Sequence, residues 1–445
     1  MKNNKKRSVL LRVTSFMLTM LLISGMAIPA FANDDDVAKG DPDTGTSAIA
    51  KITKVLEMPK GTTAPNATFT FKFKPETVEG ESYDSTKKNM PLIYDIDILI
   101  DSNTASNTTS SGVKTVYKES ADILNSLIGS WPHAGSFKYK VTETDKTYTI
   151  APDNKKEWMT YSLAEFEVEF IVDNGPGGTL YVLYIVTTRL KDDKGEEITG
   201  GEKVNPNPEG GSGSDIYSQF KFVNTYSKTT GGGEDNPEDS VLDIGNTVKG
   251  TGVNLLGTYF NFSVTVNKPE VGYVAPFYMA YVMEKGTIVS DLSNNVSSSN
   301  QAGIGTDKNG IEYFKFVPGT SADVVLRHDQ KLGFVDVPIG ASFKVTLAAA
   351  QGFFASYEMI IDGGSKITKE NKTDNTPLTA PESGFADIGE DTNNVTFLND
   401  REFSAPTGIS VNDLPFYLLI AIAAIALIAF VAIKNSFASY SRNVA

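Results

Sequence analysis

Cysteine is absent from the 445 residues of this chain, and His133 and His328 are its only histidines. The lack of cysteine excludes disulfide bonds, thiol catalysis and cysteine-ligated metal sites. Neither histidine lies near a nucleophile motif, and Gly-x-Ser-x-Gly and His-Glu-x-x-His do not occur. We therefore expect no cofactor, no metal and no enzymatic activity. Paired carboxylates of the glycosidase type are the hydrolase chemistry that the sequence leaves open.

Basic residues are in the minority: 40 lysines and arginines stand against 54 aspartates and glutamates, which gives a net charge of −14. An acidic surface repels nucleic acid, so we expect no nucleic-acid partner. The acidic run at 34–36 lacks the ligand spacing of a calcium-binding loop.

Residues 1–32 have the three parts of a secretory signal peptide. Five basic residues precede a short apolar run, and Ala30 and Ala32 then form a small-x-small cleavage site. We expect this segment to direct export and to be removed, with an uncut N-terminal anchor as the alternative. An exported protein without disulfides must stabilise its domains by core burial or by another covalent link.

A second apolar stretch, at 414–433, contains no charge and has about the length that crosses a bilayer. The weakly basic tail 434–445 follows it and is expected to stay in the cytoplasm. Upstream, at 404–408, lies Ser-Ala-Pro-Thr-Gly. This order resembles the sorting signals that sortase transpeptidases cleave between threonine and glycine, which makes Pro406, Thr407 and Gly408 the expected motif. The motif departs from Leu-Pro-x-Thr-Gly, and an ordinary membrane anchor is the alternative.

Composition divides the rest of the chain into two modules. Residues 33–48 are polar and expected to be flexible, and residues 229–240 combine glycine, proline and acidic residues as interdomain linkers do. We predict a first domain at 49–228 and a second at 241–403. The Gly- and Pro-containing segment 200–215 is expected to be a long loop inside the first domain.

Apolar and polar residues alternate along both modules, as they do in half-buried β-strands. The clearest such segments are 68–74, 136–142 and 165–170 in the first module and 259–266 and 342–347 in the second. Turn residues separate them, and no βαβ rhythm occurs. The sequence predicts an all-β fold of tandem Ig-like antiparallel β-sandwiches, with a transmembrane helix at the C-terminal end.

Three predicted strands of the first module each carry one polar residue on their apolar side. Lys54 lies near the start of the domain, Glu143 near its middle and Asn224 at its end. A lysine, a carboxylic acid and an asparagine are the groups that an intramolecular amide bond requires. The alternative is that the three share this parity by chance and that Lys54 extends its amine into water.

Burial would favour such a reaction. It disfavours the charged form of Lys54 and so lowers the pKa of its amine, which can then attack as a neutral group. It also raises the pKa of Glu143, which as an acid can hydrogen-bond the side-chain carbonyl of Asn224 and carry protons while ammonia leaves. By analogy with disulfide loop closure, the Lys54–Asn224 bond could add about 5 kcal/mol to stability.

The pattern resembles the major pilin subunits of Gram-positive bacteria, of the two-domain T-antigen type. The resemblance rests on the Thr-Lys strand before Pro-Asn-Ala-Thr-Phe-Thr-Phe, on Tyr-Lys-Val-Thr-Glu at 139–143, on Phe-Lys-Phe-Val-Asn at 220–224 and on the Pro-Thr-Gly motif with its anchor. It implies that Lys54 and Asn224 are the bond-forming pair and Glu143 the catalytic glutamate. It also implies sortase as a partner and attachment to peptidoglycan or to further subunits at the cell wall, with a role in adhesion.

The second module repeats the pattern with two changes. Asn246 takes the place of the lysine and Leu347 that of the glutamate, whereas Asn399 corresponds to Asn224. Without the amine and the proton carrier we expect no amide bond here. We expect Asn246 and Asn399 to hydrogen-bond each other instead.

Two surface functions fit these features: a fibre subunit, and a wall-anchored monomeric adhesin that binds a host or carbohydrate ligand. A fibre subunit needs an acceptor lysine for the threonine of the next subunit. Lys191, Lys194 and Lys203 are candidates by their position before the last strand of the first module, but none lies in a clear motif. The sequence names no ligand.

Overall fold

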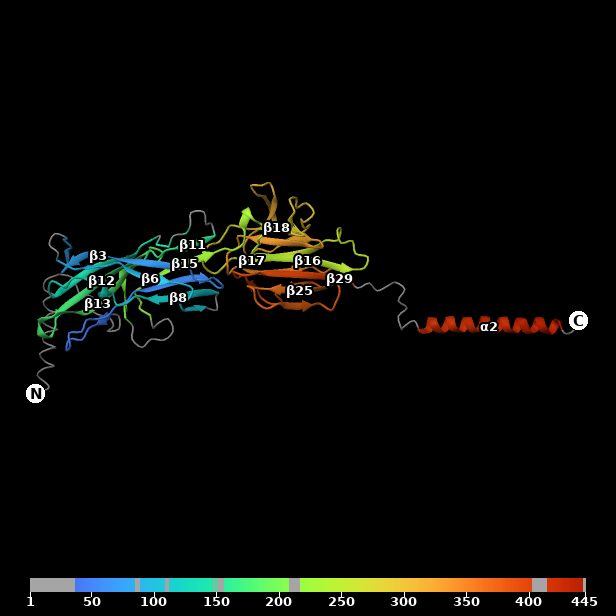
Figure 1. Cartoon of the computed structure of the whole chain (residues 1–445), viewed down its shortest axis with the longest axis horizontal. Coiled ribbons are helices and arrows are strands. Elements are labelled where there is room, and N and C mark those ends of the chain that lie inside the picture. The colour runs from blue at the N-terminus through green and yellow to red at the C-terminus, as the bar shows by residue number, and fades with distance from the viewer. Residues whose placement is uncertain are drawn as a thin grey trace, which may run out of the picture.

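Two β-sandwiches lying end to end form the body of the protein in a computed structural model (Figure 1). The structure describes residues 37–84, 89–108, 112–145, 147, 148, 150, 156–207, 217–401 and 414–442. The prediction of tandem β-sandwiches is thus confirmed. The predicted signal peptide with Ala30 and Ala32, and the sorting motif with Pro406, Thr407 and Gly408, lie outside the described residues.

The first sandwich corresponds to the first module. It has an eight-stranded and a five-stranded sheet. The larger sheet has the order β1 (Val37–Lys39), β13 (Leu180–Lys191), β12 (Glu165–Asn174), β10 (Gly135–Glu143), β3 (Ala67–Val78) and β4 (Glu81–Ser82), with β14 (Glu197–Val204) beside β13 and β6 (Ile96–Ile100) beside β3. The smaller sheet has the order β11 (Glu157–Thr160), β15 (Lys221–Lys228), β2 (Thr53–Pro59), β8 (Val113–Glu119) and β7 (Ser106–Thr108). β5 (Leu92–Ile93) pairs with β9 (Leu127–Ile128), and the 3-10 helices are η2 (Ile123–Ser126) and η3 (Pro176–Gly178).

The second module has a nine-stranded and a five-stranded sheet. The larger sheet has the order β20 (Gly303–Thr306), β21 (Glu312–Phe316), β18 (Tyr278–Glu284), β23 (Gln330–Val335), β16 (Leu242–Gly250), β29 (Asn394–Arg401), β25 (Phe354–Ile360) and β26 (Ile367–Glu370), with β19 (Thr287–Ile288) beside β18. The smaller sheet has the order β22 (Ala322–Leu326), β17 (Phe260–Asn267), β24 (Ser342–Leu347) and β27 (Leu378–Ala380), with β28 (Ala386–Asp387) beside β24. The 3-10 helix η5 (Gly233–Asp235) precedes this module.

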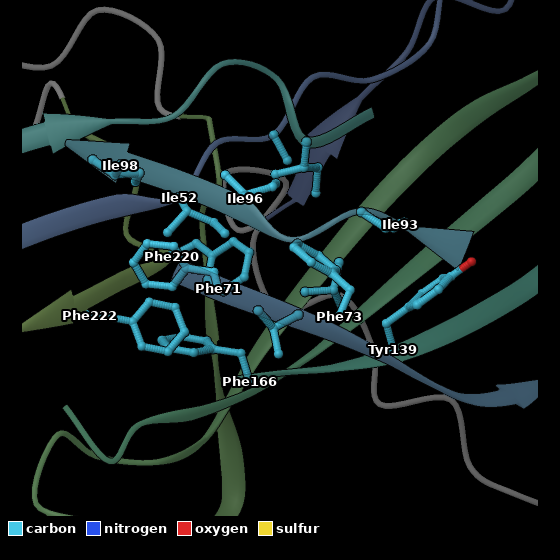
Figure 2. Packing of buried hydrophobic residues seen from close by; sticks show 14 of the residues in the cluster. Ile52, Phe71, Phe73, Ile93, Ile96, Ile98, Tyr139, Phe166, Phe220 and Phe222 are labelled. Carbon is cyan, nitrogen blue, oxygen red and sulfur yellow. The ribbon is translucent and has the colours of Figure 1, made fainter. Parts of the chain in front are cut away.

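Aromatic rings from both sheets fill the centre of the first module. Phe71 and Phe166 come from the larger sheet, Phe222 lies in β15 and Phe220 directly precedes that strand; Figure 2 shows the four rings gathered together. The ring centres of Phe71 and Phe222 are 4.9 Å apart, as are those of Phe166 and Phe220. Alternation along each strand thus places every second side chain between the sheets, where aromatic contacts hold the two layers together.

The two modules have separate cores. One cluster of buried apolar residues extends from Ala38 to Tyr226, and the other from Val241 to Phe397. The domain limits predicted at 49–228 and 241–403 remain a prediction.

In each module the last strand lies beside a strand from near the start of the module and runs parallel to it. β2 pairs with β15 in the first module and β16 with β29 in the second. The other strand pairs among the described residues are antiparallel. The expected all-antiparallel sandwich therefore has one parallel pair per module, formed where the chain enters and leaves it.

Two segments expected to be irregular contain strands. Within 33–48, expected to be flexible, Val37 and Ala38 are buried and belong to β1, and Asp41 forms a bridge with Thr46. Part of the predicted loop 200–215 belongs to β14. Both predictions were wrong at these positions because a few residues at a sheet edge can pair without an alternating pattern of their own.

The predicted linker 229–240 does not separate the modules as a free spacer. Thr229 forms a bridge with Pro338, and the carbonyl of Lys228 accepts a 3.0 Å hydrogen bond from the N–H of Ile339. Gly340 of the second module, at φ 78°, packs closely against Pro59 of the first. A Cβ at Gly340 would lie 2.5 Å from the Cβ of Pro59. The backbones of the two modules therefore touch directly.

Side chains reinforce this junction. Trp158 of the first module stacks on Tyr273 of the second, with ring centres 3.9 Å apart and planes 2° from parallel. Glu390 pairs with Lys228 at 2.8 Å and accepts a 3.0 Å hydrogen bond from the hydroxyl of Thr63. We infer that the two modules form a stiff joint.

Trp158→Ala should loosen that joint because it removes the stacked ring. Small-angle X-ray scattering of the two-module region should then show a larger maximum dimension and a broader distribution of intramolecular distances than the parent. Lys60→Ala is the matched control, since its ion pair with Asp387 is largely exposed and contributes little. Equal scattering curves for Trp158→Ala and the parent would contradict the stiff joint.

A single long helix, α2 (Leu414–Arg442), follows the second module in the sequence and includes the apolar stretch 414–433. In the part of the chain that the structure describes, no helix has the length and apolarity needed to cross a membrane. The predicted membrane span remains a prediction.

Candidate functional site

The structure brings Lys54, Glu143 and Asn224 together between the sheets of the first module. Lys54 on β2 and Asn224 on β15 come from neighbouring parallel strands, where Lys54 is paired with Phe222 and Asn224 with Leu56. Glu143 is the last residue of β10 in the opposite sheet. All three residues are buried. The inward placement of these three polar residues follows from the same alternation that buries the aromatic rings.

One carboxylate contacts both nitrogens. Lys54 Nζ lies 2.7 Å from Glu143 Oε2, and Asn224 Nδ2 donates a 2.7 Å hydrogen bond to Glu143 Oε1. The side chains of Lys54 and Glu143 are 0% exposed, so water does not screen their contact. The amine and the amide are thereby held on either side of a single acid.

Burial shifts both titratable groups toward their neutral forms. It lowers the pKa of Lys54 from 10.5 to about 8, although the nearby Glu143 acts in the opposite direction. It also raises the pKa of Glu143, against the opposing effects of Lys54 and Asn224. The Phe69 ring, whose centre is 4.7 Å from Lys54 Nζ, contributes to this apolar environment. A neutral amine next to a neutral acid is therefore accessible near neutral pH.

The amide of Asn224 is oriented differently from the sequence-based expectation. Its nitrogen, not its carbonyl, faces Glu143, and its Oδ1 accepts a 2.7 Å hydrogen bond from the backbone N–H of Ser162. The reason is complementarity, because the carboxylate is an acceptor and a backbone N–H is a donor. Sequence reasoning missed Ser162, since a backbone donor has no side-chain signature.

The second module preserves the positions but not the chemistry. Asn246 is paired with Phe397 and Asn399 with Val248, the same register that Lys54 and Asn224 have with their partners. Leu347 on β24 is paired with Phe262, as Glu143 is paired with Phe71.

The two asparagines hydrogen-bond each other, as predicted. Asn399 Nδ2 donates to Asn246 Oδ1 at 2.9 Å, and Asn246 Nδ2 donates to the carbonyl of Leu326 at 2.9 Å. Both side chains are buried, and these bonds satisfy polar groups that would otherwise be costly there. This arrangement contains neither an amine nor an acid.

The three candidate acceptor lysines lie on the β13–β14 hairpin. Lys191 ends β13 with its Nζ 3.7 Å from Glu165, Lys194 is exposed in the connecting turn, and Lys203 is on β14. All three are on the larger sheet's side of the module, so they form a group apart from Lys54 on β2.

Comparison with known proteins gave solved structures only. No protein-family model matches the chain, and no curated protein does. The major pilin from Streptococcus pyogenes is 16% identical over 80% of this chain and 99% of its own, with a TM-score of 0.31. The major pilin T-13 of the same organism is 16% identical over 82% and 99%, with a TM-score of 0.27. The pilus-presented adhesin Spy0125 (Cpa) is 10% identical over 80% and 100%, with a TM-score of 0.24. TM-scores this low do not support an inference about function.

The lowered pKa of Lys54 predicts how the free amine affects stability in Asn224→Ala, which keeps Lys54 and Glu143. Below pH 8 the lysine is protonated in both the folded and the unfolded state, so the cost of burying its charge is fully present. Between pH 8 and 10.5 the folded state loses its proton first, and the free energy of unfolding should therefore rise with pH. The rise should reach about 3 kcal/mol.

Urea unfolding of Asn224→Ala at a series of pH values measures this rise. The control is the double variant Lys54→Met, Asn224→Ala, which has the same background titrations but no buried amine. Parallel stability curves for the two variants would show that Lys54 has an ordinary pKa.

Proposed function

We propose that this protein is a structural subunit of a bacterial surface fibre, a pilin, whose first module is cross-linked by an amide bond between Lys54 and Asn224. The observation that carries the proposal is the buried contact of one carboxylate with both reacting nitrogens, at 2.7 Å each. A cross-linked sandwich is suited to a chain that must withstand pulling without disulfides.

A purely structural role for the three residues does not explain why the free-energy cost of burying them is accepted. Taking a lysine and a glutamate out of water is expensive, and a buried ion pair often stabilises a fold no better than apolar residues of similar volume. The second module shows that the same positions can hold two asparagines and a leucine. An amide bond removes the charge permanently and so explains why a lysine is buried here.

The proposed reaction uses these contacts. Neutral Lys54 Nζ attacks Cγ of Asn224 and forms the new C–N bond. Oε2 of Glu143 takes a proton from Nζ, and the acid delivers a proton from its Oε1 side to Nδ2. The bond between Cγ and Nδ2 then breaks, and ammonia leaves. Each chain reacts once on itself, so the protein performs a maturation step and is not an enzyme.

The bond would tie the last strand of the first module to a strand near its start. β2 is near the start of the first module and β15 is its last strand, and the two are neighbours in one sheet. A covalent bond between them would keep these two strands from separating when the module is under tension.

The proposed location at the cell surface is supported by the sequences of the two terminal segments. We propose that residues 1–32 direct export, that a sortase joins Thr407 to an acceptor, and that 414–433 holds the precursor in the membrane until then. The acceptor would be peptidoglycan or a lysine of the next subunit, with exposed Lys194 on the β13–β14 hairpin and its neighbours Lys191 and Lys203 as candidates. A host surface ligand would be the partner of an adhesive fibre.

The amide bond predicts the mass of the protein. A purified fragment of residues 33–403 should weigh one ammonia less than its sequence, because the first module reacts and the second lacks the amine and the acid. Intact-mass spectrometry measures this directly. Finding the full sequence mass would end the proposal, and loss of two ammonias would show that the second module also reacts.

Glu143→Ala should restore the full mass because the proton carrier is gone. The same change should lower the stability of the first module by about 5 kcal/mol or more, since the loop closure is lost and Lys54 is left unpaired. The second module, with its own core, should unfold as before. Asn399→Ala is the matched control in that module and should leave the ammonia loss unchanged.

Anchoring is tested separately. Thr407→Ala should leave the protein in the membrane fraction and deplete it from enzymatically digested cell wall. The reason is that a sortase would cleave the peptide bond between Thr407 and Gly408. Immunoblots of the two fractions measure the shift, and Ser410→Ala, outside 404–408, serves as the control. Wall attachment that persists in Thr407→Ala would contradict sorting at this site.

A further inference from the structure

We infer that the backbone N–H of Ser162 stabilises the oxyanion that forms on Asn224 during amide-bond formation, and that Asp193 is the residue that positions this donor. The inference rests on the proposed amide bond and adds a part that the three predicted residues lack. It assigns a role to the segment between β11 and β12.

The first observation is the contact itself. Ser162 is buried, and its N–H lies 2.7 Å from Asn224 Oδ1. In the part of the chain that the structure describes, this N–H is the one donor that reaches Oδ1. Glu143 does not hydrogen-bond Asn224 Oδ1, because the two carboxylate oxygens of Glu143 contact the nitrogens of Lys54 and Asn224.

The second observation is that each atom of the amide has the partner its chemistry requires. When Nζ attacks Cγ, the carbonyl electrons move to Oδ1, which becomes negatively charged. A preoriented N–H in a dry site stabilises that charge more than it stabilises the neutral carbonyl. The leaving nitrogen faces the acid and the developing oxyanion faces the donor, so Ser162 and Glu143 act on opposite ends of one amide.

Asp193 connects the donor to the strand that carries the target. Its Oδ1 accepts hydrogen bonds from the hydroxyl of Ser162 at 2.6 Å and from the N–H of Val223 at 2.8 Å. Arg189 pairs with the other oxygen. Since Val223 precedes Asn224, one carboxylate fixes the distance between Ser162 and the amide that it contacts.

A backbone ester tests the donor without changing the side-chain surroundings. The full chain is made by cell-free translation with lactic acid at position 162, which replaces the N–H by oxygen, and with alanine at 162 as the matched amide. Samples taken over time are digested, and mass spectrometry gives the fraction of the branched Lys54–Asn224 peptide. The ester should react about 10²- to 10³-fold more slowly than Ser162→Ala, the effect of removing one oxyanion donor.

The outcomes separate the two ideas. If the wild-type chain never yields the branched peptide, the amide bond and the role of Ser162 both fail. If wild type reacts and the ester reacts as fast as Ser162→Ala, the amide bond stands and the oxyanion role is overturned. Near-UV circular dichroism of both proteins in the Glu143→Ala background shows whether the ester folds like its control.

Asp193 gives a second test that does not depend on the ester. Asp193→Asn and Asp193→Ala both remove the charge, but only asparagine keeps an oxygen that can accept from Ser162 and Val223. Asp193→Ala should therefore form the branched peptide at least tenfold more slowly, and Asp193→Asn should restore most of the rate. Equal rates in the two variants would overturn the positioning role, because a loss of charge alone affects both alike.

Discussion

The contact of the Glu143 carboxylate with Lys54 and Asn224 is the interaction on which the first module depends. It places an amine, an acid and an amide, groups that water normally solvates, in the centre of an aromatic core. As separate groups they are a liability, because each needs a partner at the right distance. As reactants they are preorganised by the same packing that makes their burial costly. The packing of the module and its proposed reactivity therefore both depend on the alternation of side chains along these strands.

The parallel pairing of β2 with β15, the last strand of the first module, makes this contact feasible. It brings residues 170 positions apart in the sequence onto adjacent strands, while the third residue comes from the facing sheet. Both modules share this pairing, although the second has neither the lysine nor the glutamate. The strand arrangement therefore does not require these two residues. Two differences within one strand arrangement, Asn246 in the place of Lys54 and Leu347 in the place of Glu143, distinguish the second core from the first. The junction at Trp158 and Tyr273 then joins the two modules into one rod-like unit.

Alternating residues were enough to predict the sandwiches and the inward placement of Lys54, Glu143 and Asn224, because a strand's period of two fixes which side chains share a face. The same reasoning could not orient the amide of Asn224, since both orientations have the same parity. It also missed β1 and β14, which pair at sheet edges with little pattern of their own. The close junction could not be predicted from the sequence. A linker rich in glycine and acidic residues has the same composition whether it is free or packed against the modules.

The second module shows how the same strand arrangement forms a core without the lysine and the glutamate. With Asn246 in the place of lysine, the donor and acceptor groups of two amides satisfy each other and a backbone carbonyl. Leu347 then fills the position from which an acid would act, so no unpaired charge remains. Each change alone would be unfavourable: a lysine without the acid leaves a buried charge, and an acid without the lysine leaves a carboxylate among apolar residues. The lysine and the glutamate are therefore expected to be gained or lost together, which makes the module either reactive or inert and disfavours the intermediate states.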